Sequence, residues 1–399
     1  MKLNPQEKAM LDGKEGPATQ KAMQILTTLG KIYGAEKLIP AKSVQIAGVS
    51  YDNLGEAGLS FLEEMATGGG KTRTITTLNP AGMDIENWEK LGISPEFARN
   101  QNRVLEAFSS MGVNTTCSCT PYLVGNNPNY GDNIAWSESS AVCYANSVIG
   151  ARTNREGGPS ALAAALTGKT PAYGYHIEEN RKPTVSIKVN SSLEGTYHFG
   201  ALGLAISKKL DQHTKKIPFI TGISSANLEE LKSFCASIAT YAGAAIFHMQ
   251  GITPEAYLYD QPSQSLEINE RDIDQAKLII SSKIEDEEID FVSLGCPHLA
   301  INEIARIAEI LKGKEVKKEF WITTGRPTKK TADSLGYSKI IEASGAKFAT
   351  DTCCVVAPIK GRFKTLVTDS AKACYYGASK NNFKTLLLPF DDVVEAALK

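Results

Sequence analysis

The feature that most constrains the fold of this chain is an alternation of short apolar runs with amphipathic helical stretches. Runs typical of buried strands occur at 43–50, 183–190, 216–223, 244–252, 290–298, 318–326 and 346–358. Helical patterns separate most of them, such as 17–34, 56–70, 227–244 and 300–313. Strands that alternate with helices predict an α/β fold built on largely parallel sheets. In such sheets ligands bind where strands end, so the turns after these strands are the places to look for a site.

Composition excludes several classes of protein. The 399 residues are enough for two or three cores, and a formal net charge of −1 argues against a nucleic-acid-binding surface. No apolar run approaches the ~20 residues that span a bilayer, and the polar first residues do not resemble a signal peptide. Eight cysteines in a chain of this length are too few for a disulfide scaffold. We therefore expect a cytoplasmic protein whose working cysteines act as ligands or nucleophiles.

The cysteines divide by their local pattern. Three lie within helical stretches and are interpreted as core residues: Cys143, Cys235 and Cys374. Three others lie at expected strand ends or turns: Cys119, Cys296 and Cys353. Thiolates from distant segments can hold an iron–sulfur cluster, and a cube held by only three cysteines leaves one iron open to act as a Lewis acid.

Other interpretations of the cysteines stay open from the residues alone. The spacings of 177 and 57 residues between the three cysteines match no local cluster motif. A zinc site built on Cys117 and Cys119 has no second half-site of suitable spacing. His298, close to Cys296, is retained as a candidate site residue, whereas the other histidines are scattered: His176, His198, His213 and His248.

Two turns suit an anionic ligand. The stretch 46–58 runs from a strand through glycine and Ser50 into a helix, where backbone N–H groups could hold a phosphate or carboxylate. The stretch 76–84 is a second turn of this kind, with the Asn79 side chain free to donate and Pro80 fixing the bend.

A third stretch carries two arginines. Arg152 and Arg155 precede a helix expected from Pro159 and suit an acidic substrate, although an ion pair with Glu156 is a structural alternative. By contrast, "GGGKT" at 68–72 is not a phosphate-binding loop, because its first required glycine is replaced by methionine and a helix precedes it.

The stretch from Cys119 to His176 closely resembles the central block of the aconitase X family. The segments "SYDNLGEAG", "TTLNPAGMD", "SLGCPH", "DTCCVVAP" and "DSAKACYY" resemble its other signatures, so the resemblance covers nearly the whole chain. It implies an aconitase-like catalytic core of three α/β domains around an iron–sulfur cluster, with dehydratase activity. We place the domain boundaries near residues 205 and 330.

The resemblance also implies the site residues. The cluster ligands fall on Cys119, Cys296 and Cys353, with [4Fe-4S] favoured over [2Fe-2S], while the neighbouring thiols of Cys117 and Cys354 leave the choice within each pair open. Substrate-binding residues fall on Gly48, Val49, Ser50, Asn79, Pro80 and Glu138, with Arg152 and Arg155 as further candidates. Catalytic residues fall on Ser139 and Lys372, which would also contact the substrate. Each of these two has a structural alternative, as a helix N-terminal residue and as a solvated helix charge.

The length of the chain implies a partner. Fused family members carry an additional swivelling domain, and this chain is expected to lack it and to need a small subunit that supplies that domain and the serine base. Without that subunit the chain should be a poor catalyst. Of the two substrates known for two-subunit members, we favour 5-phosphomevalonate, which would be dehydrated to trans-anhydromevalonate 5-phosphate, over cis-3-hydroxy-L-proline. A non-catalytic iron-sensing or RNA-binding role and a zinc hydrolase are the rival hypotheses.

Overall fold

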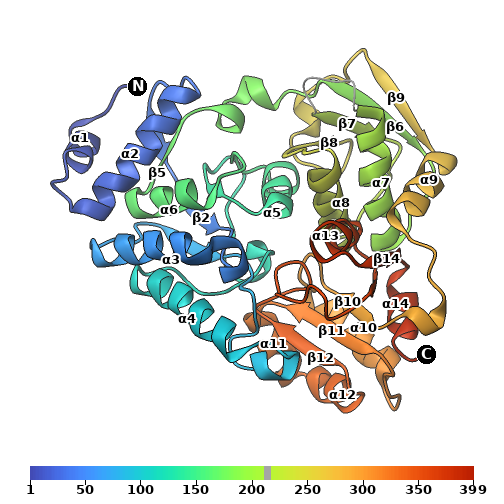
Figure 1. Cartoon of the computed structure of the whole chain (residues 1–399). Helices are drawn as coiled ribbons and strands as arrows, with labels where there is room; N and C mark the ends of the chain where they lie inside the picture. The colour runs from blue at the N-terminus through green and yellow to red at the C-terminus, as the bar shows by residue number, and fades with distance from the viewer. Residues whose placement is uncertain (211–216) are drawn as a thin grey trace.

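Parallel sheets dominate the architecture of the chain. The computed structural model describes residues 1–210 and 217–399; His213 and the first residue of the strand expected at 216–223 lie outside the described residues. Three parallel sheets follow one another along the chain and define three units, whose strand orders are β3-β2-β4, β8-β7-β6-β9 and β12-β11-β10-β13-β14. Figure 1 shows the units grouped around a common centre, with the first in blue to green and the third in orange to red.

The first unit surrounds the shortest of the parallel sheets. Its strands are β2 (Ser43–Ile46), β3 (Ile75–Leu78) and β4 (Ala135–Trp136), and a separate antiparallel pair joins β1 (Leu38–Pro40) to β5 (Lys169–Pro171). Its helices are α1 (Pro5–Leu11), α2 (Pro17–Ile32), α3 (Tyr51–Thr67), α4 (Pro95–Ser110), α5 (Ser139–Tyr144) and α6 (Gly158–Thr167). The helix expected at 56–70 is the part of α3 that follows Gly55 and ends at Thr67. Gly55 itself is not helical, with a φ of 60° and a ψ of −172°, so a short helical turn from Tyr51 meets this helix at a kink.

The second unit follows the pattern of strand and helix expected from the sequence. Its strands are β6 (Val185–Asn190), β7 (Pro218–Thr221), β8 (His248–Met249) and β9 (Ser265–Asn269). Its helices are α7 (Gly195–Leu210), α8 (Leu228–Tyr241) and α9 (Glu270–Ile280). An asparagine caps both α8 and α9 by accepting a hydrogen bond from a backbone N–H of the first turn, which explains where these helices begin.

The third unit contains the largest sheet. Its strands are β10 (Phe291–Leu294), β11 (Glu319–Thr324), β12 (Lys347–Thr350), β13 (Thr365–Thr368) and β14 (Lys384–Leu387). Its helices are α10 (Ile301–Leu311), α11 (Arg326–Ser334), α12 (Tyr337–Ala343), α13 (Ala371–Asn381) and α14 (Phe390–Ala396). Every strand pair in the three parallel sheets is parallel, which confirms the predicted fold class.

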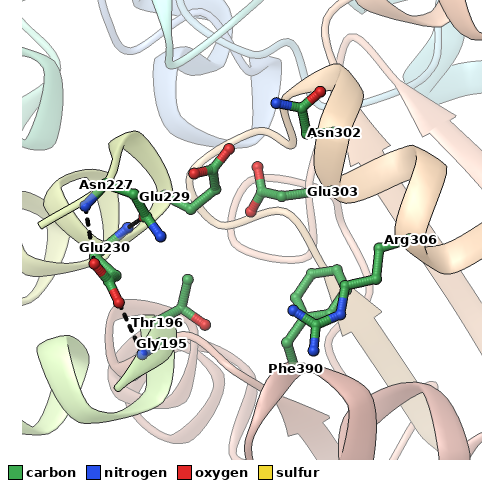
Figure 2. A pocket seen from close by; sticks show the side chains of 9 residues that line it. All are labelled: Gly195, Thr196, Asn227, Glu229, Glu230, Asn302, Glu303, Arg306 and Phe390. Atoms are coloured by element: carbon green, nitrogen blue, oxygen red, sulfur yellow. Dashed lines mark hydrogen bonds between the residues drawn. The ribbon is translucent and has the colours of Figure 1, made fainter. Parts of the chain in front are cut away.

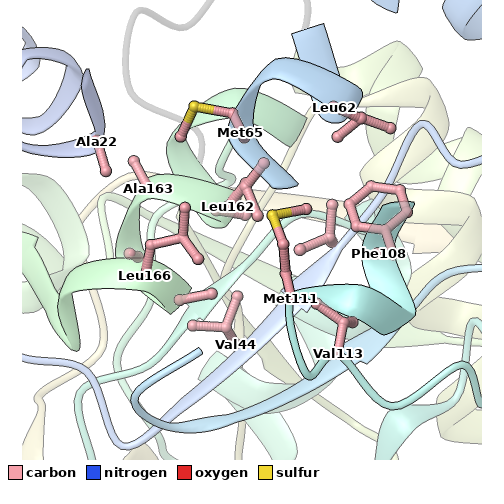
Figure 3. Close-up of a cluster of buried hydrophobic side chains, with 14 of the residues drawn as sticks. Ala22, Val44, Leu62, Met65, Phe108, Met111, Val113, Leu162, Ala163 and Leu166 are labelled. Atoms are coloured by element: carbon pink, nitrogen blue, oxygen red, sulfur yellow. The ribbon is translucent and has the colours of Figure 1, made fainter. Parts of the chain in front are cut away.

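Apolar packing joins the units into one body. In the first unit, helix residues such as Leu62, Met65, Phe108 and Leu166 pack against Val44 of the sheet (Figure 3). The cluster around the second sheet also takes in Cys143 from the first unit and Cys374 from the third. Cys143, Cys235 and Cys374 are all buried, so the interpretation of these three cysteines as core residues is confirmed.

The boundaries between the three units do not lie near residues 205 and 330. Residues 205 and 330 lie inside α7 and α11. The strands of the first unit end at Pro171 and those of the second begin at Val185, while the strands of the second unit end at Asn269 and those of the third begin at Phe291. Polar stretches rich in charge, 178–182 and 283–290, accompany both changes. Neither stretch is rich in glycine or proline, the residues that mark a boundary most clearly in a sequence. No helix among the described residues is long and apolar enough to cross a membrane.

Candidate active site

The candidate site residues follow the carboxyl ends of parallel strands in the first and third units. Glu138 follows β4, Cys296 follows β10, Cys353 follows β12 and Lys372 follows β13. Cys119 lies beside the end of β3, where the backbone N–H of Ser118 donates to the carbonyl of Leu78 at 2.9 Å. The predicted location of the site at strand ends therefore agrees with where the structure has these residues.

Lys372 and Glu138 form a buried ion pair between the two units. The Lys372 ammonium donates to Oε1 of Glu138 and lies 3.4 Å from Oγ of Ser139. Burial alone would lower the pKa of Lys372, but the charges of Glu138 and Cys296 hold it above its ordinary value. Burial likewise opposes ionisation of Glu138, yet Lys372 holds the pKa of that carboxyl below its usual range. Both groups are therefore charged at neutral pH, and Lys372 is not a solvated surface lysine.

Three cysteine thiols gather beside this ion pair. Burial raises the pKa of Cys119, and Glu138, Cys353 and Cys296 raise it further, so these groups lie within electrostatic reach of one another. Burial and Cys353 raise the pKa of Cys296 to about 12, while the Lys372 charge opposes this rise. The structure thus brings together residues that are 177 and 57 positions apart in the chain.

Hydrogen-bond donors are directed at all three sulfur atoms. The backbone N–H of His298 donates to Sγ of Cys119 at 3.2 Å. Backbone N–H groups of Val355 and Val356 and the hydroxyl of Ser370 donate to Cys353 and Cys296, and each donor lowers the pKa of its thiol. Donors of this kind favour the thiolate, which is the form that binds metal. The donor set therefore fits an iron–sulfur cluster.

Cys117 and Cys354, which neighbour two of these three cysteines in the sequence, pack in apolar clusters. Cys117 belongs to the apolar core of the first unit, and its positive φ of 43° marks the bend between it and Cys119. Cys354 belongs to an apolar cluster that contains Phe291 and Trp321, and its thiol is hydrogen-bonded to Ser293. Cys119 and Cys353 belong to neither cluster, and Cys296 only borders the second one as a partly buried residue. This arrangement supports Cys119 and Cys353, and not their neighbours, as the ligands.

A single metal ion has no matching site. Among residues 1–210 and 217–399, no three or more side chains of histidine, cysteine, aspartate or glutamate converge as the ligands of one ion. This finding argues against the zinc hypothesis. It does not count against a cluster, because each cysteine of a cluster binds its own iron and the sulfur atoms stay farther apart.

Two of the predicted substrate turns connect to the thiols. Ser50 is buried, and its hydroxyl donates to the carbonyl of Val356 at 3.1 Å, close to Cys353. The preceding residue, Val49, is also buried, whereas Gly48 is exposed and has a φ of 80°. Asn79 is half-buried and accepts a hydrogen bond from Gln45 at 3.3 Å. The buried residue Pro80 follows it, and the next N–H donates to the carbonyl of Asp351 at 2.8 Å. Both turns therefore border the segment that carries Cys353.

The two candidate arginines differ in their surroundings. Arg152 forms an ion pair of 3.6 Å with Glu178, and no described contact links it to the thiols. Arg155 is exposed and has no hydrogen bond or ion pair among the described residues. The alternative pairing with Glu156 is not formed, since the carboxylate of Glu156 instead accepts from the hydroxyl of Ser160 at 2.6 Å. Arg155 is thus the more available of the two for an anionic ligand.

Sequence reasoning missed Gln45 in the middle of β2. This residue is fully buried and lies in register with Thr77 of β3 and Trp136 of β4. Its side chain accepts from the backbone N–H of Glu138 at 3.0 Å and donates to Asn79 and to the carbonyl of Ser118. A glutamine within an apolar run of a central strand is the signal that could have identified it, because a buried amide needs partners.

A cavity of about 280 Å³ lies between the second and third units. Figure 2 shows Thr196 and Glu229 on one side and Glu303, Arg306 and Phe390 on the other. A narrower space shares Thr196, Glu229 and Glu303 with it and reaches Cys296. The candidate site thus borders a cavity that the sequence did not predict.

Comparisons with known proteins decide the family. Three family models match successive parts of the chain: the aconitase X first domain over residues 1–179, the second domain over 183–278 and the third domain over 289–399. The chain belongs to the aconitase X family. The predicted three-domain fold is confirmed, and membership of this aconitase-like family implies an iron–sulfur cluster.

Relatives and a solved structure agree with this assignment. The chain is similar to proteins named phosphomevalonate dehydratase large subunit from Methanothermobacter thermautotrophicus (44% identity, 94% of this chain and 93% of the relative) and Methanocaldococcus jannaschii (43%, 94% and 95%). It is 32% identical to the cis-3-hydroxy-L-proline dehydratase of Hypocrea jecorina, with 94% of this chain matching 65% of that protein. A crystal structure of Thermococcus kodakaraensis aconitase X in its holo-form superposes with a TM-score of 0.92 at 40% identity over all of both chains.

Proposed function

We propose that this family member is the large subunit of a two-subunit dehydratase that converts (R)-5-phosphomevalonate to trans-anhydromevalonate 5-phosphate. The observation that carries the proposal is identity of 43–44%, over 93–95% of their length, to the two archaeal relatives named for this activity. The relatives named for hydroxyproline are 31–32% identical. The names of the archaeal relatives also support a small-subunit partner.

Cys119, Cys296 and Cys353 would hold the cluster, for which [4Fe-4S] is favoured over [2Fe-2S]. A cluster with three protein ligands supplies a Lewis acid that makes the tertiary hydroxyl a better leaving group. Two buried hydroxyls beside these residues, those of Ser137 and Thr352, have no hydrogen-bond partner among the described residues, which is consistent with a further group in this region.

Lys372 serves as a fixed cation in this proposal. Its pKa is held above the ordinary value, so it is a poor proton donor at neutral pH and acts by charge. The ammonium would attract the substrate carboxylate, and Ser139, 3.4 Å from it, would orient the same group. Glu138 keeps the ammonium in place and is itself positioned by N–H of Ala141 at 2.6 Å.

The phosphate would bind at the turn of residues 48–50 and the beginning of α6. Gly158 lies so close to the carbonyl of Ala47 that a Cβ there would approach the oxygen to 2.9 Å, so the turn and the helix N-terminus are adjacent. A helix N-terminus attracts anions, and the exposed Arg155 precedes this one. With the carboxylate at Lys372 and the phosphate here, the substrate is held at both ends.

The reaction then proceeds by loss of a proton and a hydroxyl from neighbouring carbons. A base removes the proton from the carbon next to the carboxylate, the C–O bond at the tertiary carbon breaks, a C=C bond forms and water leaves. In this proposal the base is a serine of the small subunit, so the large subunit alone turns over slowly.

The test is an assay of the two candidate substrates. The chain is purified without oxygen together with the small subunit, and dehydration of 5-phosphomevalonate and cis-3-hydroxy-L-proline is followed separately. We expect turnover of 5-phosphomevalonate that Cys296→Ala abolishes and Cys374→Ala, a change at a buried core thiol, retains. Turnover of hydroxyproline alone would overturn the substrate, and equal turnover by both variants would overturn the role of Cys296.

A further inference from the structure

His298 makes contact with all three cysteine-bearing segments. Its side chain is fully buried and its own segment carries Cys296 two residues earlier. Its backbone N–H donates to Sγ of Cys119, as described above. Its ring nitrogen atoms lie 3.1 Å from Oγ of Ser118 and 2.9 Å from the carbonyl of Thr352, residues directly before Cys119 and Cys353.

The partners of the ring fix its protonation. The carbonyl of Thr352 can only accept, so Nε2 carries the hydrogen. A neutral imidazole with its hydrogen on Nε2 presents Nδ1 as an acceptor, and this atom lies within hydrogen-bond distance of the hydroxyl of Ser118. Ser118 in turn accepts from the backbone N–H of Thr120 at 3.2 Å. The Ser118 hydroxyl also lies 3.1 Å from that of Thr120. The ring therefore connects the segments of Cys119 and Cys353 through its two nitrogen atoms.

A lysine of the second unit holds the backbone of His298. Lys232 is almost fully buried and its ammonium donates to the carbonyl of His298 at 3.0 Å and to Oε2 of Glu303 at 2.5 Å. The same carboxylate oxygen accepts from the backbone N–H of Ala300 at 2.7 Å. His298 is thus held at two points, by its ring and by its carbonyl. The carbonyl is bound by Lys232, whose partner Glu303 lines the cavity of Figure 2.

We propose that His298 is a positioning residue that holds the segments of Cys119, Cys296 and Cys353 at the spacing a cluster needs. This inference rests on the proposed iron–sulfur cluster and goes beyond it by naming the group that keeps the ligands in register. Three loops that meet only at their thiols would move independently, and partners of this kind typically change metal affinity by about 10- to 100-fold.

The test compares two histidines in matched surroundings. His248 is also buried, and its Nε2 lies 2.8 Å from a backbone carbonyl, that of Arg181, away from the cysteines. The full chain and its His298→Ala and His248→Ala variants are supplied with ferrous iron and sulfide without oxygen. Iron and sulfide per chain are measured, followed by the rate at which a chelator removes the iron.

We expect both variants to lower the free energy of unfolding of the cluster-free chain. Only His298→Ala should release iron faster, by about 10- to 100-fold. His298→Gln, which keeps an N–H near the position of Nε2, should recover part of this loss. Ser118→Ala leaves the ring in place and removes the partner of Nδ1 together with the contacts of that hydroxyl to Thr120, so it provides a milder variant if His298→Ala does not fold.

The outcomes separate this inference from the proposed function. Equal release rates for His298→Ala, Ser118→Ala and His248→Ala, with iron bound by the unchanged chain, would overturn the role of His298 and leave the cluster intact. Absence of iron from the unchanged chain after reconstitution would overturn the proposed cluster, and this inference with it.

Discussion

At the scale of single residues, the charged groups of the candidate site are of two kinds, one that is paired within the protein and one that is not. Lys372 forms a buried ion pair with Glu138, whereas Arg155 is exposed and has no partner among the described residues. A buried pair that satisfies itself contributes more to specificity and positioning than to net stability. An unpaired guanidinium, by contrast, can form a charge-assisted hydrogen bond to a ligand without first breaking an ion pair.

This difference predicts unequal effects of two arginine substitutions on substrate binding. Arg155→Gln should raise KM for 5-phosphomevalonate by about 10- to 100-fold, the value of a lost charge-assisted hydrogen bond, with iron content unchanged. Arg152→Gln, which breaks an ion pair with Glu178, should leave KM within about threefold of the original. Steady-state kinetics measure both, and a larger effect at Arg152 would reverse the assignment.

At the scale of elements, the turn between β10 and α10 is tightly constrained. Gly295, which precedes Cys296, has a φ of 104°, and a Cβ there would approach the carbonyl oxygen of Thr323 to 2.2 Å. Gly313 has a φ of 73° after α10, but a Cβ there would meet nothing within 4 Å. Substitution at Gly313 therefore costs only the free energy of an unfavourable backbone conformation. Substitution at Gly295 adds a steric collision to that cost.

Alanine substitutions at these glycines should differ in both stability and iron binding. Gly313→Ala should lower the free energy of unfolding by about 1 kcal/mol, the cost of a positive φ. Gly295→Ala should cost about 3 kcal/mol or more, because β10 and β11 must move apart, and it should reduce iron uptake by displacing Cys296. Chemical denaturation and iron analysis test this, and similar results for the two variants would show that the turn is not constrained by packing.

The elements also show what sequence reasoning can and cannot find. Apolar runs and glycine turns predicted the parallel strands and placed Cys296 and Cys353 at their ends, because these signals are local. Gln45 was missed because its partners, Glu138 and Ser118, lie 93 and 73 residues away. The position of Cys117 in the core, apart from Cys119, depends on a backbone bend that the residue types do not reveal.

At the scale of the whole molecule, buried polar contacts hold the units together around the site. Arg181, in the stretch that joins the first two units, forms a buried ion pair with Glu255 of the second unit and donates to Asn146 of the first. Lys232 and Glu303 connect the second unit to the third. Since the thiols come from the first and third units, the relative placement of the units determines whether the three sulfur atoms meet.

Asp369 makes one of these contacts dependent on pH. The hydroxyl of Thr196 in the second unit donates to its carboxylate at 2.7 Å, yet burial raises the pKa of Asp369 to about 6. The unfolded carboxyl titrates near 3.8, so the folded chain binds the proton more tightly. The resulting stabilisation is complete below pH 3.8 and is lost as the pH rises through about 6.

Asp369→Asn should therefore remove the pH dependence that ionisation of this buried carboxyl gives to the free energy of unfolding. Relative to this variant, the unchanged chain should lose up to about 3 kcal/mol of unfolding free energy between pH 4 and pH 7. Urea denaturation of the cluster-free chain at a series of pH values measures the difference. A difference that does not vary with pH would show that Asp369 stays ionised throughout.

The central claim is that three cysteines from two units hold an iron–sulfur cluster, and adjacent cysteines offer its most direct test. Cys353 and Cys354 are both buried, but only Cys354 packs in the apolar cluster that contains Phe291 and Trp321. We would measure iron and acid-labile sulfide per chain in Cys353→Ala and Cys354→Ala, reconstituted without oxygen. The account predicts loss of the cluster in Cys353→Ala and a full complement in Cys354→Ala. Full iron and sulfide in Cys353→Ala, with loss in Cys354→Ala, would contradict it.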